Sequence, residues 1–83
     1  MICLSKDGLR TTEATGFVVN ETVSVCKYYK EGESKYNNPG EKIYCLYSNN
    51  GYLMDAFENG IEAKEKLREA MKALATGLEI FEF

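Results

Sequence analysis

The stretch GIEAKEKLREAMKALAT, residues 60–76, is the only strongly periodic segment of the sequence, and the other predicted elements are arranged around it. Its apolar side chains recur at spacings of three and four, which predicts an amphipathic helix. The expected buried stripe holds five apolar residues and one lysine stem: Ile61, Lys64, Leu67, Met71, Leu74 and Ala75. Ala63 and Ala70 widen this stripe and allow close approach to a sheet. The opposite face is expected to lie in water: Glu62, Glu65, Lys66, Arg68, Glu69 and Lys72.

Sequence signals bound this helix at both ends. Asn59 is the expected N-cap, and Glu62 three residues later completes an asparagine version of the capping box. Glu62 and Lys66 have the i,i+4 spacing of a favourable ion pair on a helix. Gly77 is the expected C-cap, because glycine accepts the backbone conformation that commonly ends helices. Residues 78–83 then alternate, which predicts a final strand that docks at a sheet edge or pairs with another copy of the chain.

The residues before the helix supply the sheet on which it would lie. Residues 42–47 and 52–57 flank Asn50-Gly51, which predicts an antiparallel hairpin closed by a type I′ turn. Further strands are expected at 1–4, 9–13, 17–19 and 22–29, with turns or breaks at 6–8, 14–16 and 20–21. The sequence therefore predicts one α+β domain spanning residues 1–83. We expect a curled antiparallel sheet of four to five strands, the helix packed across one face, and a short C-terminal strand.

Composition narrows the classes of function. The chain has 83 residues and a net charge of −3, and its charges alternate in sign without a basic stripe. Nucleic-acid binding is therefore not expected. No run approaches the ~20 apolar residues that span a bilayer, so no membrane association is expected. Three cysteines, an odd count without close pairs, and a start unlike a signal peptide predict a reduced, cytoplasmic location in a host cell.

Catalytic groups are scarce. The sequence contains no histidine, which excludes Ser-His and Cys-His nucleophile systems and any metal site that uses histidine. Cys3, Cys26 and Cys45 lack the Cys-x-x-Cys spacing of a zinc site and are interpreted as small buried hydrophobes. A pairing of Cys26 with Cys45 across a hairpin remains an open alternative. We therefore expect a protein that is not an enzyme and that uses no metal or cofactor.

Tyrosine is the residue type that points to a binding surface. The chain has six tyrosines and no tryptophan; four of the six flank the polar segment 30–41, and a fifth, Tyr36, lies in it. Rigid aromatic rings beside asparagines suit protein recognition. The predicted partner-binding residues are Tyr36, Asn37 and Asn38, with Tyr29 and Tyr44 as anchors. Two alternatives stay open: about half of the rings cover the core, or the rings stack a nucleotide base. For a nucleotide, the local cationic donors are Lys27, Lys30 and Lys42.

With these elements placed, the chain resembles a set of small β-rich, one-helix proteins from phages and mobile elements of Gram-positive bacteria. The resemblance is carried by Met1-Ile2-x-Leu4, Lys6-Asp7-Gly8, Asn59, Ala63, Leu67, Gly77 and Ile80-Phe81-Glu82. It implies a β-rich domain with one helix and an origin in a mobile genetic element, and it brings no activity and no site residues.

Size, the lack of catalytic groups and this resemblance together favour an accessory protein that binds a host protein stoichiometrically. An inhibitor of a host defence system, in the manner of an anti-CRISPR protein, is the leading hypothesis. The alternatives are an oligomeric sponge that sequesters a small nucleotide signal, and a minor structural or assembly protein of a virion.

Overall fold

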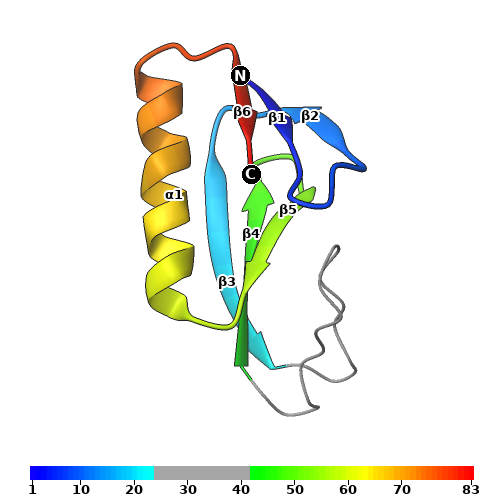
Figure 1. The fold of residues 1–83 in the computed structure, drawn as a ribbon, viewed down its shortest axis with the longest axis vertical. Coiled ribbons are helices and arrows are strands. Elements are labelled where there is room, and N and C mark those ends of the chain that lie inside the picture. The colour runs from blue at the N-terminus through cyan, green and yellow to red at the C-terminus, as the bar shows by residue number, and fades with distance from the viewer. Residues whose placement is uncertain (24–41) are drawn as a thin grey trace.

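The computed structural model describes residues 1–23 and 42–83 and shows a small α+β fold (Figure 1). Its elements in chain order are β1 (Ile2–Leu4), β2 (Thr11–Glu13), β3 (Phe17–Val23), β4 (Lys42–Ser48), β5 (Leu53–Phe57), α1 (Gly60–Ala75) and β6 (Ile80–Glu82). The predicted helix and the predicted C-terminal strand are both present. The strand expected at 22–29 lies outside the described residues from position 24 onward.

The strands form two three-stranded sheets, so the prediction of one sheet with four to five strands is wrong. One sheet has the order β2-β1-β6 and the other the order β3-β4-β5. β6 runs parallel to β1, with Ile80 opposite Ile2. A parallel neighbour requires a long crossover connection, and here everything between β1 and β6, including α1, lies in that crossover. The expected docking of the last strand at a sheet edge is confirmed, because β6 lies at the end of its sheet.

The predicted hairpin is confirmed, since β4 and β5 pair antiparallel with Tyr44 opposite Phe57. Its type I′ turn is wrong. Gly51 has a φ of 88°, but no described residue other than glycine has a positive φ, and type I′ needs two such positions. The Gly51 amide donates to the Ser48 carbonyl (3.0 Å), and the Ser48 amide donates to the Tyr52 carbonyl (2.9 Å). These bonds define a longer loop that ends in a left-handed glycine.

The longer loop frees two asparagine side chains to join the two sheets. Asn49 Oδ1 accepts a hydrogen bond from the Thr15 amide at 2.9 Å. Asn50 Nδ2 donates to Thr12 Oγ1 at 2.7 Å. The Lys6 amide adds a third link, donating to the Met54 carbonyl at 2.8 Å. The sheets are therefore tied through polar contacts at the hairpin turn as well as through the core.

β3 continues through the position where a turn was expected. Asn20 pairs with Cys45 and Glu21 with Tyr44, in one unbroken antiparallel ladder from Phe17 to Val23. Both side chains are exposed on a strand at the sheet edge, where polar residues are tolerated. Glu21 also forms an ion pair with Lys42 of β4 at 3.1 Å. The predicted turn at 20–21 is therefore wrong, because cross-strand pairing overrides its local turn preference.

Both ends of α1 follow the sequence signals. Asn59 is the N-cap, and its side-chain oxygen accepts from the Ile61 amide at 2.7 Å. A capping box would direct this bond to Glu62 instead. At the other end, Gly77 has a φ of 76°. Its amide donates to the Leu74 carbonyl, and the Leu78 amide donates to the Ala73 carbonyl. This bond pattern is a Schellman motif, which satisfies carbonyls of the last helical turn.

α1 buries the predicted stripe only in part: Ala63 and Ala70, expected to widen it and to allow close approach, are buried, and Leu67 packs against the core cluster. Its buried residues are Ala63, Ala70 and Ala73, whereas Ile61 is 67% exposed and Met71 is 44% exposed. Lys66, expected in water, is partly buried and forms an ion pair with Glu69 instead of the expected pair with Glu62. The helix contacts all three strands of the β3-β4-β5 sheet. Alanines at the contact permit a close approach that larger side chains would block.

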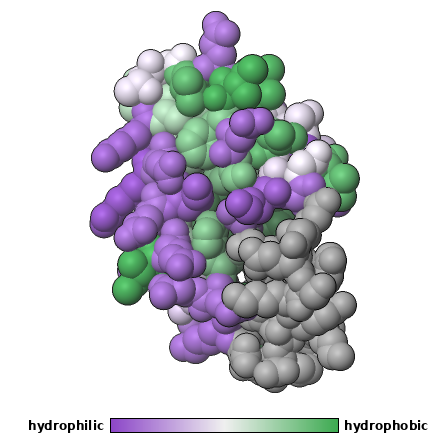
Figure 2. All heavy atoms as spheres, viewed as in Figure 1, coloured by the Kyte–Doolittle hydropathy of each residue, from purple (hydrophilic) through white to green (hydrophobic). Residues whose placement is uncertain are grey.

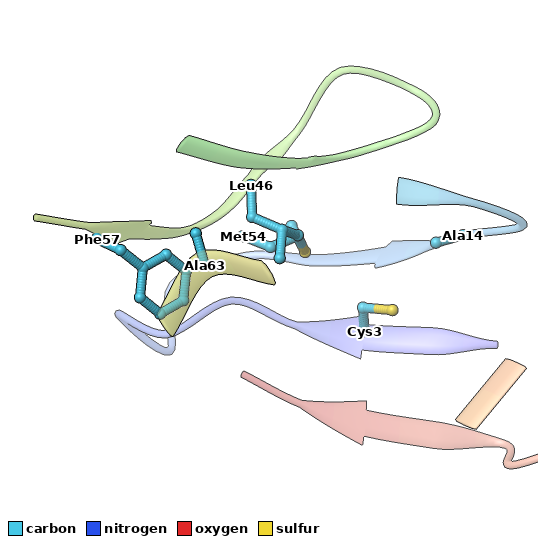
Figure 3. Packing of buried hydrophobic residues seen from close by; sticks show 6 residues of the cluster. All are labelled: Cys3, Ala14, Leu46, Met54, Phe57 and Ala63. Atoms are coloured by element: carbon cyan, nitrogen blue, oxygen red, sulfur yellow. The ribbon is translucent and has the colours of Figure 1, made fainter. Parts of the chain in front are cut away.

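The core lies between the two sheets and the helix. Figure 3 shows its side chains converging from β1, β4, β5, α1 and the segment after β2. The buried cluster consists of Cys3, Ala14, Leu46, Met54, Phe57 and Ala63. Phe83 adds an edge-to-face contact with Phe17, with ring centroids 5.5 Å apart. The interpretation of the cysteines as buried hydrophobes is confirmed for Cys3 and Cys45, while Cys26 lies outside the described residues.

Candidate protein-binding surface

Only one of the sequence-predicted binding residues falls within the described part of the chain. Tyr29, Tyr36, Asn37 and Asn38 lie outside it, and their predicted role stays a prediction. Tyr44 is half-buried on β4 and packs against the core cluster. Its ring lies over the first residue of α1, since a Cβ placed on Gly60 would sit 3.1 Å from Tyr44 Cζ. This ring therefore has a packing role whether or not it also contacts a partner.

A second surface emerges where β1, β6 and the end of α1 meet. Ile2 and Leu78 are each 48% exposed and Ile80 is 60% exposed. We call these three residues the aliphatic patch. Ile2 and Ile80 lie opposite each other in the parallel ladder, so they share the outer face of the sheet. Figure 2 shows hydrophobic atoms gathered at the upper end of this face of the molecule, where Figure 1 places the starts of β1 and β6.

The patch is exposed because the alternate residues of both strands occupy the core. Cys3 is fully buried, and its ladder partner Phe81 packs against the core cluster. Successive side chains of a strand point to opposite faces, so Ile2 and Ile80 must point outward. Beside them lies an open groove of about 420 Å³. The groove is lined by Met1, Ile2, Glu13, Leu74, Gly77, Leu78 and Glu79.

Carboxylates surround the aliphatic patch. Glu13 lies opposite Ile2 in the β1-β2 ladder, and Glu82 lies opposite Leu4 in the β1-β6 ladder, so both share the outer face. Glu79 lines the groove. We call these three residues the carboxylate rim, and all three are exposed. Within residues 1–23 and 42–83, the ion pairs are Glu21–Lys42 and Lys66–Glu69, so no described side chain pairs with the rim. The Met1 ammonium, which donates to the Ala14 carbonyl, lies in the same groove.

One edge of β6 also offers backbone hydrogen-bonding groups. The Glu79 carbonyl accepts from the Ile2 amide, and the Phe83 amide donates to the Leu4 carbonyl, so residues 79, 81 and 83 face β1. By strand alternation, the amide and carbonyl groups of Ile80 and Glu82 point to the other side. No described strand pairs with β6 on that side. An unpaired edge next to apolar side chains is a template for another strand.

The cysteines and carboxylates of the described residues form no cluster for a metal ion. Across positions 1–23 and 42–83, no three cysteine or carboxylate side chains come close enough to hold a metal ion. Burial raises the pKa of the Cys3 and Cys45 thiols, which keeps both in the unreactive protonated form at neutral pH. In the same part of the chain, no helix has the length and apolar character needed to cross a membrane.

The sequence contains a signal for the aliphatic patch, which the prediction based on tyrosines did not use. In LEIFEF, residues 78–83, both faces of the expected strand carry apolar residues. A terminal strand has one face on the core, so one apolar set had to remain outside. The sequence could not show that the phenylalanines would take the inner face.

A scan against family models, a search of the curated proteins and a search of the solved structures each found no significant match to this chain.

Proposed function

We propose that this protein acts by stoichiometric binding to another protein and is not an enzyme. The observation that supports this proposal is the aliphatic patch, where Ile2, Leu78 and Ile80 lie together with about half or more of their surface exposed. Exposed contiguous apolar surface with a polar border is typical of protein interaction sites. Core packing already occupies the opposite face of the same strands, so the patch is not needed to hold the fold.

The class of partner rests on the sequence. The resemblance to small proteins of Gram-positive phages and mobile elements supports a host protein as the partner and the host cytosol as the location. Within that class, we propose an inhibitor of a host defence system, such as a CRISPR effector. An inhibitor requires a complementary surface and no catalytic group, and this agrees with a chain that lacks histidine. A nucleotide sponge is less favoured, because carboxylates border the described groove and Lys42 is paired with Glu21.

The proposal is tested by capture of partners from lysate of a Gram-positive host, followed by titration of the captured protein with purified chain. We expect one partner retained in fixed molar ratio by the natural chain. Ile80→Ser should lose it, because a polar side chain replaces the most exposed member of the patch. Leu9→Ser is the matched control, since Leu9 is an exposed aliphatic residue in the turn after β1.

The same experiment separates the two candidate surfaces. A variant carrying Tyr36→Ala, Asn37→Ala and Asn38→Ala tests the tyrosine-flanked segment predicted from sequence. Loss of the partner with this variant, and retention with Ile80→Ser, would move the binding site to residues 30–41. Retention of no protein in fixed ratio by the natural chain would refute the binding function.

A further inference from the structure

We propose that the partner of the aliphatic patch is an extended segment that adds a strand to the open edge of β6 and carries an apolar residue and a basic residue two positions apart on the same face. This inference rests on the proposed binding function and specifies its partner. It is carried by three independent features of the described residues: the open edge of β6, the apolar side chains beside it, and the carboxylate rim.

The open edge defines the mode of binding. The amide and carbonyl groups of Ile80 and Glu82 point away from β1, and no described strand meets them. An added strand satisfies these groups with its own backbone, as in other complexes formed by strand addition. Side chains on the added strand would then stand beside those of β6 on the outer face.

The side chains of β6 define the pattern of that strand. Ile80 and Glu82 are two residues apart and share the outer face, with Ile2 and Leu4 behind them on β1. A neighbouring strand therefore needs an apolar residue beside Ile80 and a cation beside Glu82, because directly opposed side chains interact most strongly. These two residues of the partner must also be two positions apart.

A second copy of this chain does not supply the required pattern, because the outer face of its β6 carries Ile80 and Glu82 and no cation. Glu13 and Glu82 share the outer face and form no ion pair with a described side chain, so two copies joined face to face would bring four carboxylates together. Like charges that face each other across strands are destabilising. A basic segment turns the same rim into a source of attraction and of faster association.

The test uses short synthetic peptides and the full chain. The probe has threonine at every second position and alternates valine and lysine on the other face. A second peptide replaces lysine with glutamate, a third replaces valine with serine, and a fourth repeats the probe with N-methyl groups on the backbone amides of one edge. Affinity is measured by fluorescence anisotropy, and the site is located by amide chemical shifts.

We expect the valine–lysine probe to bind at least about tenfold more tightly than each of the other three peptides, a difference of about 1.4 kcal/mol. Amide shifts should concentrate at Ile80 and Glu82. Ile80→Ser should weaken binding about tenfold, whereas Leu9→Ser should leave it unchanged. Equal affinity of the glutamate peptide would overturn the basic partner, and equal affinity of the methylated peptide would overturn strand addition.

Failure of this inference is distinguishable from failure of the proposed function. If Ile80→Ser abolishes capture of a host protein but the probe does not bind, the binding function stands and the strand-addition inference is wrong. If the probe binds at β6 but no host protein is retained, the inference stands and the proposed function is wrong.

Discussion

The Tyr44 ring leaves little room for a side chain at Gly60, the first residue of α1. A Cβ on residue 60 would lie 3.1 Å from Tyr44 Cζ and 3.2 Å from Cε1, closer than ordinary van der Waals contact. We predict that Gly60→Ala destabilises the protein by about 0.5–1.5 kcal/mol, because overpacking outweighs the better helix propensity of alanine. In a Tyr44→Ala background, the same substitution should be neutral or stabilising.

Urea denaturation of the four members of this double-mutant cycle measures the coupling. Glu65→Ala, at an exposed position of the same helix, serves as the control for propensity. An identical effect of Gly60→Ala in both backgrounds would contradict the contact. The cycle also bears on the predicted anchor role of Tyr44: a Tyr44→Ala variant that loses stability must be shown to be folded before its partner binding is interpreted.

The buried thiols give the protein a defined alkaline limit. Burial raises the pKa of the Cys3 and Cys45 thiols, and burial together with the neighbouring Cys45 raises the pKa of the Tyr47 phenol. Folding therefore favours the neutral form of each group. Their contribution to stability is fully present below the ordinary thiol pKa of about 8.5 and is lost as pH rises through the folded-state values.

We predict that the urea midpoint falls between pH 8 and pH 10, the range that spans about 1.5 units above the ordinary thiol pKa. The double variant Cys3→Ala and Cys45→Ala should show a smaller decline than the natural chain over the same range. An unchanged decline in that variant would assign the alkaline sensitivity to other groups.

At the scale of elements, α1 shows where sequence periodicity succeeds and where it fails. Asn59 and Gly77 marked the helix ends because capping depends on local backbone chemistry. The buried face could not be read as securely. Hydrophobicity ranks Ile61 and Met71 above alanine, but the buried positions of the helix hold alanines, and Leu67 packs against the core beside them. How closely α1 approaches the sheet depends on the side chains of both elements, so the helix sequence alone does not predict which face is buried.

This difference yields a direct test of the helix face. Ala70 is fully buried, whereas Ile61 is mostly exposed. We predict that Ala70→Leu loses about 1–3 kcal/mol of stability through overpacking. Ile61→Ser should change stability by no more than about 0.5 kcal/mol, as for an ordinary surface substitution. Chemical denaturation of both variants decides the matter. The opposite ranking would restore the stripe predicted from sequence, with Ile61 and Met71 inside.

Local sequence predicts some of the strand pairings, and contacts between distant parts of the chain determine the others. The β4-β5 hairpin was predictable because Asn50-Gly51 lies between two alternating segments. The split into two sheets was not, since β1 and β6 pair across almost the whole chain. Nothing local to Ile2 or Ile80 indicates that they become neighbours. The sequence therefore did not predict the aliphatic patch, and the predicted binding surface lay at the local cluster of tyrosines instead.

At the scale of the whole molecule, the aliphatic patch raises the question of why the chain would not associate with itself. An exposed edge strand beside apolar side chains favours self-pairing, and the sequence left a homo-oligomer formed through an edge strand as an open alternative. The carboxylate rim opposes face-to-face association, because Glu13 and Glu82 on the outer face would meet their counterparts in a second copy. We therefore expect a monomer at neutral pH and low salt.

Replacing the rim carboxylates with neutral amides of similar shape should allow the chain to associate with itself. We predict that a triple variant with Glu13→Gln, Glu79→Gln and Glu82→Gln self-associates at concentrations where the natural chain stays monomeric. Adding Ile80→Ser to the triple variant should restore the monomer, since the attraction between copies comes from the patch. Sedimentation equilibrium measures the molar mass of each variant. A monomeric triple variant, or a natural chain that is already dimeric, would show that the rim does not control association. In either case, charge complementarity would no longer favour a basic partner.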